Sequence, residues 1–167
     1  MNTRLKTNPE IQTESLTTRV AFHPFPAGMN RTPLTLLTDC AVARHFNTGQ
    51  TILLEGEFAN GFYLIETGKV ALESEAGFGE SIFIQTIGAG DLLGWSWMFP
   101  PYVWQFTARA VEPTSALFFY AETLREYCEK HHSLGYELLK RISAVMVKRL
   151  QAAHDQMLAL YSKPRVA

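Results

Sequence analysis

Glycines that recur at nearly regular intervals separate short apolar segments between residues 44 and 120 of this sequence. They stand at positions 49, 56, 61, 68, 77, 79, 88 and 90. Short strands with turn residues at this spacing are typical of a β-sandwich or a β-barrel. A tight turn at Gly68 is expected to join two strands as a hairpin. We predict strands over residues 43–47, 51–55, 62–67, 69–75, 81–87, 104–111 and 115–120.

Helical patterns flank the predicted strands on both sides. Thr32 and Pro33 predict the start of a short helix that runs to residue 43, because proline suits the first helical position. After the strands, residues 122–130 predict a helix, and a longer one begins near His132 and ends near Tyr161. In the longer helix apolar residues recur at steps of three and four, which indicates a helical stripe. They are Leu134, Leu138, Leu139, Ile142, Val145, Met146, Leu150, Ala153, Met157 and Leu160.

The long helix is predicted to extend beyond the barrel. At 1.5 Å per residue it measures about 40 Å, which exceeds the width of a small barrel. Part of its apolar stripe therefore needs another partner, and we expect a homodimer through this helix. The residues predicted at the dimer interface are Leu138, Ile142, Val145, Met146, Arg149 and Ala153.

The length of 167 residues fits one domain with a tail. We divide the chain into a mobile tail over residues 1–22 with at most one weak helical turn, a helix plus β-barrel over 23–120, and C-terminal helices over 121–162. Two cysteines are too few for a disulfide scaffold, and no apolar run resembles a signal peptide or a membrane-spanning helix. The expectation is a cytoplasmic protein with free thiols.

Charge is unevenly distributed along the chain. Residues 32–120 hold three basic and nine acidic side chains, whereas residues 121–167 hold eight basic and five acidic ones. An acidic barrel is unsuited to nucleic acid, whose binding depends on neutralised phosphates. Six residues after the long helix are too few for a DNA-binding domain. We therefore expect no direct DNA binding and no membrane association.

Signatures of catalysis and of metal binding are missing from the sequence. The histidines do not recur at ligand spacing beside a carboxylate, and the histidine-x-histidine strand of a metal-bearing cupin barrel is absent. Ser96 lacks the second glycine of a nucleophile elbow, and no Walker-type loop occurs. We expect no enzyme activity, no metal and no cofactor, with a cupin-like metalloenzyme as the weaker alternative.

Four segments carry a more specific pattern than the strand count. They are GQTILLEG at 49–56, FYLIETGKV at 62–70, GDLLG at 90–94 and TARA at 107–110. Together they resemble the cyclic nucleotide-binding domain family, in which the last two segments enter and leave the phosphate-binding cassette. The resemblance covers residues 23–160. It implies a mainly β fold with flanking helices, namely a double-stranded β-helix or jelly-roll barrel followed by a long C-terminal helix, as in catabolite-activator-type sensor domains.

At the cassette this sequence departs from the nucleotide-binding members of the family. Those members carry a glutamate after the cassette glycine, where Trp95 stands here, and further on an arginine that pairs with the cyclic phosphate. No residue between Trp95 and Ala108 is charged. Arg109 is the candidate substitute, although strand alternation turns it outward if Phe106 and Ala108 face inward. Because an unpaired phosphate is costly to bury, we do not expect cyclic AMP to bind in the usual mode.

Aromatic residues take the place of the missing charged groups. They either fill the pocket as core or line a site for a flat or apolar small molecule. We predict a regulatory ligand sensor; the alternatives are a ligand-free protein-interaction module with a plugged pocket and a true cyclic-nucleotide-binding regulator. The candidate ligand-binding residues are Gly94, Trp95, Ser96, Trp97, Met98, Trp104, Gln105, Phe106, Thr107 and Arg109.

Overall fold

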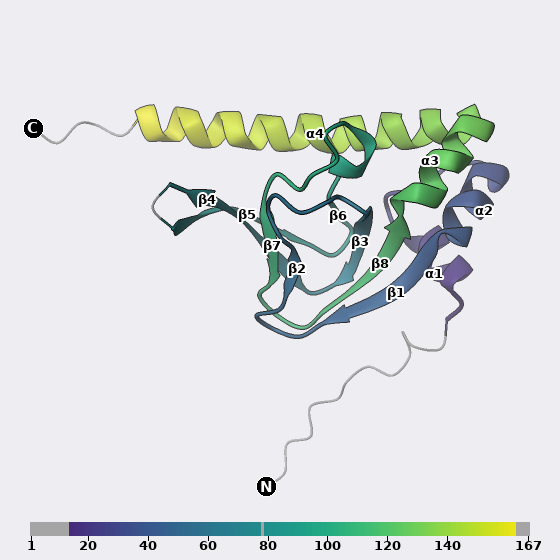
Figure 1. Cartoon of the computed structure of the whole chain (residues 1–167), viewed down its shortest axis with the longest axis horizontal. Helices are drawn as coiled ribbons and strands as arrows, with labels where there is room; N and C mark the ends of the chain where they lie inside the picture. Colours follow the sequence, from purple (N-terminus) through teal and green to yellow (C-terminus); the bar gives the residue numbers. More distant parts are fainter. Residues whose placement is uncertain (1–13, 78, 163–167) are drawn as a thin grey trace, which may run out of the picture.

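The computed structural model describes residues 14–77 and 79–162, which form two antiparallel four-stranded sheets with flanking helices (Figure 1). This arrangement confirms the mainly β fold and the long C-terminal helix expected from the sequence. In chain order the elements are α1 (Leu16–Phe22), α2 (Arg31–Asp39), β1 (Ala41–Phe46), β2 (Thr51–Leu53), β3 (Gly61–Thr67), β4 (Lys69–Ala76), β5 (Glu80–Gly88), β6 (Leu92–Leu93), the 3₁₀ turn η2 (Ser96–Met98), β7 (Thr107–Ala110), β8 (Thr114–Tyr120), α3 (Ala121–Lys130) and α4 (His132–Tyr161).

The strand orders are β1-β8-β3-β6 in one sheet and β2-β7-β4-β5 in the other. In the first sheet Leu117 on β8 lies between Ala43 on β1 and Leu64 on β3. In the second sheet β4 pairs with both β5 and β7. Leu64, Leu72 and Leu117 are buried, because two sheets that pack face to face bury their inward side chains between them.

The predicted hairpin at Gly68 is wrong. Strands β3 and β4 belong to different sheets, so the chain crosses from one sheet to the other at this turn. Gly68 has a φ of +94°, and a Cβ atom there would lie 2.5 Å from the carbonyl oxygen of Pro113. Both the positive φ and the close approach of the backbone require glycine.

The strand predicted over residues 104–111 is shorter than expected. Only Thr107–Ala110 joins a sheet as β7. Trp104 instead accepts a hydrogen bond from the backbone N–H of Gly56 and donates one to the carbonyl of Glu57, both at 2.9 Å. This local pairing with the turn after β2 diverts the backbone before it reaches the sheet.

The N-terminal helices also differ from the prediction. Helix α1 lies within the segment predicted as a tail, and Ser15 caps it by accepting a hydrogen bond from the backbone N–H of Thr18. The rest of that predicted tail, up to residue 13, lies outside the described residues. Helix α2 starts after Asn30 and ends at Asp39, because the residues from Ala41 onward pair with β8 as strand β1. The division of the chain into three segments stays a prediction.

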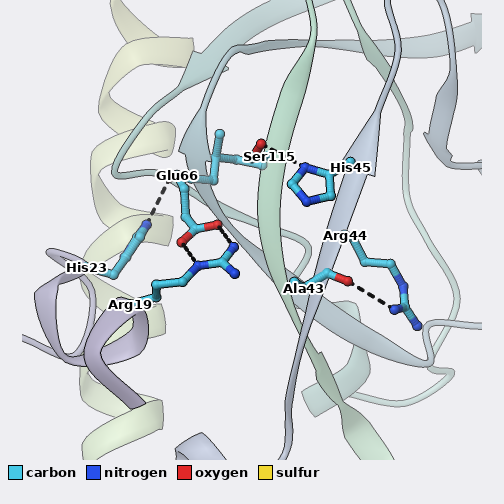
Figure 2. A network of polar contacts seen from close by, with 8 residues as sticks. Arg19, His23, Ala43, Arg44, His45, Glu66 and Ser115 are labelled. Carbon is cyan, nitrogen blue, oxygen red and sulfur yellow. Dashed lines mark hydrogen bonds and ion pairs between the residues drawn. The ribbon is translucent and has the colours of Figure 1, made fainter. Parts of the chain in front are cut away.

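A buried ion pair fixes α1 against the first sheet (Figure 2). Nε and Nη2 of Arg19 donate to the two carboxylate oxygens of Glu66 on β3, at 2.9 and 2.6 Å. The two side chains are only 10% and 12% exposed. A bidentate pair of this kind sets orientation as well as attraction, so it links α1 to β3 in a defined orientation.

His23 is held in one protonation state beside this ion pair (Figure 2). Its Nε2 lies 3.0 Å from the carbonyl oxygen of Ile65, and its Nδ1 accepts a hydrogen bond from the backbone N–H of Phe25 at 3.1 Å. Only the neutral ring with its proton on Nε2 satisfies both contacts. Burial lowers the pKa of His23 below its ordinary value.

Acidification is therefore expected to destabilise the fold through His23. As the pH falls through the ordinary histidine pKa of about 6.5, the unfolded chain takes up a proton before the folded chain does. Stability is complete above that pH and decreases below it, by at most about 1.4 kcal/mol per pH unit. Urea unfolding of the native protein and of His23→Gln between pH 7.5 and 5 measures this effect, because the other histidines are common to both. Equal pH dependence in the two proteins would contradict it.

Helix α4 begins inside the core and ends outside it. Leu134, Leu138 and Ile142 are fully buried against other parts of this chain. Leu138 and Ile142 therefore offer no surface to a second copy, which corrects their predicted place at a dimer interface. The 30-residue helix is about 45 Å long. Its second half runs above the β4–β5 hairpin in the view of Figure 1.

Candidate functional site

The segment between β6 and β7 carries the predicted cassette. Gly94 follows β6 with a φ of +84°, and a Cβ atom there would lie 2.5 Å from the indole ring of Trp104. Glycine at this position therefore allows both the turn and the close packing of Trp104 across it. The turn η2 follows, with the backbone N–H of Met98 bonded to the carbonyl of Trp95 at 3.1 Å.

Two of the three tryptophans belong to the core of the barrel. Trp97 and Trp104 are 1% and 4% exposed. The ring of Trp97 stacks on Phe62 with centroids 5.6 Å apart, and Phe62 stacks in turn on Phe119 at 4.7 Å. Within the described residues the indole N–H of Trp97 has no hydrogen-bond partner. Apolar packing alone therefore holds this ring, and both indoles fill space that would otherwise lie open beside the cassette.

The third tryptophan lies at the mouth of the barrel, where a cavity remains. Trp95 meets Phe106 edge to face, with centroids 6.4 Å apart. These two rings, Leu72 on β4 and Gln85 on β5 line a cavity of about 200 Å³. Arg149 and Gln156 of α4 close the side that faces the helix. The cavity thus combines a predominantly apolar wall with polar groups from the long helix.

Arg149 lies at this cavity and packs against the barrel of its own chain. It was predicted at the dimer interface, but its guanidinium lies 4.7 Å from the ring centroid of Trp95 and its Nη2 donates to the carbonyl oxygen of Leu92. Its Nη1 is buried and has no hydrogen-bond partner among the residues described. Burial lowers the pKa of Arg149 to about 10, against the opposing effect of Asp91. The group still carries its charge at neutral pH.

A second arginine binds the cassette from α3. Nη1 of Arg125 donates to the carbonyl oxygen of Trp97 at 2.7 Å, and its guanidinium lies 4.9 Å from the ring centroid of Tyr102. Both C-terminal helices therefore contact the cassette through an arginine that bonds a backbone carbonyl and stacks on an aromatic ring.

One sequence signal pointed to Arg149. It lies four residues after Val145 and seven after Ile142, on the side of the helix that faces the barrel.

Three predicted site residues lie away from the cavity. Nη1 of Arg109 donates to the carbonyl of Gly49 and to the hydroxyl of Thr51, at 3.2 and 3.1 Å, so its charge is directed toward β2. The hydroxyl of Thr107 accepts a hydrogen bond from the backbone N–H of Glu55. Gln105 is exposed and bonds within its own loop. Arg109 therefore bonds to the strand beside it and is not part of the lining of the cavity between Trp95 and Phe106.

The remaining candidates support the cassette from inside the chain. Ser96 is buried in η2, and Met98 packs against the core. Elsewhere, burial raises the pKa of the Cys40 thiol to about 12, which leaves no thiolate for nucleophilic chemistry at neutral pH. Over residues 14–77 and 79–162, no group of three histidine, cysteine or acidic side chains could hold a metal ion. None of the helices in those ranges is both long and apolar enough to span a bilayer.

Comparison with known families agrees with this architecture. The profile of the family described as "Cyclic nucleotide-binding domain" matches residues 43–131, which is more than half of the chain. The chain belongs to the cyclic nucleotide-binding domain family. The match includes both sheets and the cassette, and it confirms the resemblance carried by the spaced glycines. The comparison with curated protein sequences gave no match.

Solved structures of this family share the fold at low sequence identity. A domain from Methylobacillus flagellatus KT gives a TM-score of 0.76 at 17% identity, over 90% of this chain and 86% of that one. A protein from Geobacter metallireducens GS-15, described as cyclic nucleotide-binding, gives 0.73 at 24% identity, over 82% and 99%. The catabolite activator protein of Thermus thermophilus gives 0.64 at 24% identity, over 83% of this chain but 63% of its own.

Proposed function

We propose that this member of the cyclic nucleotide-binding domain family is a regulatory sensor that does not bind cyclic AMP in the usual mode. The observation that supports this most strongly is the source of the positive charge at the cavity. The charge comes from Arg149 on α4, whereas the cassette itself supplies aromatic rings. A ligand held there would contact the barrel and the long helix together. The position of α4 would then report whether the cavity is occupied.

The size of the cavity supports the same proposal. Pockets for drug-sized ligands usually measure roughly 300–1,000 Å³, whereas this one measures about 200 Å³. A cyclic nucleotide carries a base, a sugar and a cyclic phosphate, and a ligand of this size would require the side chains that line the cavity to move.

We expect cyclic AMP and cyclic GMP to bind weakly or not at all. Titration of either nucleotide up to about 1 mM, a range that detects as little as about 4 kcal/mol of binding free energy, should leave the tryptophan fluorescence unchanged and release no heat in calorimetry. Trp95→Phe is the matched variant, because it removes the only one of the three indoles outside the core and identifies the source of any response. Saturable one-to-one binding at micromolar concentration would overturn the proposal.

The proposed sensor is a homodimer through α4, with an interface shifted from the one predicted. Exposed residues along α4, together with the half-buried Met146, follow alternating steps of three and four, the repeat of a coiled-coil seam. An apolar groove lined by Trp95 and Val147 borders this seam. Val145 and Met146 are both half-buried and pack against the core of their own chain. Of the predicted set, Met146 and Ala153 fall on the seam, whereas Val145 lies off its repeat. The seam consists of Leu139, Ser143, Met146, Leu150, Ala153, Met157 and Leu160.

One observation favours a second candidate, a protein-interaction module without a ligand. Trp97 and Trp104 already fill much of the space beside the cassette. In that case α4 and the aromatic cassette would contact a protein partner, and no small molecule would bind at the cavity. The absence of DNA binding, of enzyme activity and of a membrane partner, together with a cytoplasmic location, stays a prediction from the sequence.

A further inference from the structure

We propose that the cavity at the mouth of the barrel binds a small aromatic carboxylate. Its anionic group would pair with Arg149 of α4, and its ring would lie against Trp95 and Phe106. This inference rests on the proposed function, because it names the ligand class of the same site.

The charge of Arg149 is the first argument. Its Nη1 is buried without a hydrogen-bond partner, and no carboxylate lies within ion-pair distance of its guanidinium in the described part of the chain. A buried cation without an anion is costly, so a protein that retains one at a cavity commonly uses it. A carboxylate on a ligand would supply the missing acceptor through charge-assisted hydrogen bonds.

The lining of the cavity indicates on which side of Arg149 the anion would bind. Arg149 lines three hollows. One is also lined by Asp91, whose carboxylate would repel an anion, and another is the apolar groove that borders the seam on α4. The cavity between Trp95 and Phe106 has no acidic residue in its lining, and Gln85 and Gln156 bring amide groups to its wall, which the apolar groove lacks. An anion is therefore favoured on the side of the aromatic rings.

The shape and size of the cavity indicate the rest of the ligand. Trp95 and Phe106 pack edge to face on each other, and both rings also line the cavity, where their remaining aromatic surface suits contact with a flat apolar ring. A cavity of roughly 150 Å³ takes up benzene, so about 200 Å³ suits a single ring that bears a carboxylate. Arg149 stacked on Trp95 and bonded to Leu92 already ties α4 to the barrel, and a ligand on its remaining nitrogen would tighten that contact.

The test uses benzoate, phenylacetate and indole-3-acetate as probes, each compared with its neutral amide. Binding to the full chain is measured by tryptophan fluorescence and calorimetry, for the native protein, Arg149→Lys, Arg149→Met and Lys148→Met. The neighbouring Lys148 is exposed and is the matched control. We expect at least one acid to bind tenfold or more tightly than its amide. Arg149→Met should abolish this preference, Arg149→Lys should retain part of it and Lys148→Met should retain all of it. Hydrogen exchange in α4 should slow near Arg149 when the acid binds.

The outcomes separate this inference from the function on which it rests. Equal affinity for acid and amide, an unchanged preference in Arg149→Met, or no binding of any probe would overturn the carboxylate site. If cyclic nucleotides also fail to bind, the proposed departure from the usual nucleotide mode still stands. Tight binding of cyclic AMP together with a lack of carboxylate binding would overturn both. An unchanged circular dichroism spectrum of Arg149→Met shows that the variant is folded, so that a loss of binding is not caused by unfolding.

Discussion

Ile142→Asp is expected to unfold this domain. Ile142 has no exposed surface and lies in the same core as Leu134 and Leu138. A carboxylate at this place would be buried without a cation, so we expect the free energy of unfolding to fall by more than about 4 kcal/mol. Circular dichroism during thermal and urea unfolding measures the loss. The sequence stripe alone placed Ile142 at a dimer seam, where the same substitution would separate two folded chains instead.

Leu150→Asp is the matched control for the other side of the same helix. Leu150 is 71% exposed, so an aspartate there remains hydrated and the fold of a single chain should be kept. In the proposed dimer Leu150 lies at the centre of the seam, and two buried carboxylates would oppose association. Sedimentation should then give a folded species near the monomer mass of 18.8 kDa. A folded Ile142→Asp protein, or an unfolded Leu150→Asp protein, would contradict this assignment of the two helix faces.

Gly94→Ala is expected to destabilise the cassette and the core together. The residue has a φ of +84°, and the added methyl group would lie 2.5 Å from the ring of Trp104. A left-handed conformation costs a non-glycine residue about 1–2 kcal/mol, and overpacking adds a similar amount. We therefore expect a loss of about 3 kcal/mol in the free energy of unfolding. Displacement of Trp104 toward water should also shift the tryptophan emission to longer wavelength.

Gly77→Ala tests whether this effect belongs to the cassette. A Cβ atom at Gly77 would meet nothing within 4 Å, and its φ lies outside the left-handed region. Alanine at such a position should change stability by less than about 1 kcal/mol. If Gly94→Ala were equally harmless, the close packing of Trp104 across the glycine would be contradicted.

The fold could be predicted from the sequence because its signals are local. Turn glycines at Gly49, Gly56 and Gly90 have positive φ values, a property that does not depend on distant parts of the chain. The apolar steps of α4 and its start near His132 likewise follow from helical periodicity. The turn at Gly68 was located correctly, but whether two strands pair or diverge there depends on which other strands border them. That information is not local, so the predicted hairpin was wrong.

The candidate site was predictable only in part. The aromatic cassette and the outward direction of Arg109 followed from the positions of residues in the sequence. Which tryptophans belong to the core could not be predicted, because it depends on contacts made in the folded chain. Trp97 stacks on Phe62 of β3, and Trp104 packs across Gly94. The role of Arg149 was missed because a helical stripe gives the face on which a residue lies, but not the partner that the face meets.

The family, the coarse order of a short helix, strands and a long helix, and the lack of charged side chains in the cassette could be predicted from the sequence alone, because each depends on residue type and on short spacing. The tertiary structure decided which side of α4 faces its own barrel. That choice follows from the crossing of α4 over the sheets, which buries Ile142 and directs Arg149 onto Trp95. Periodicity could place Arg149 on a helical stripe but not at a cavity. It lines the cavity because packing brings it against Trp95, which lies 54 residues earlier in the chain.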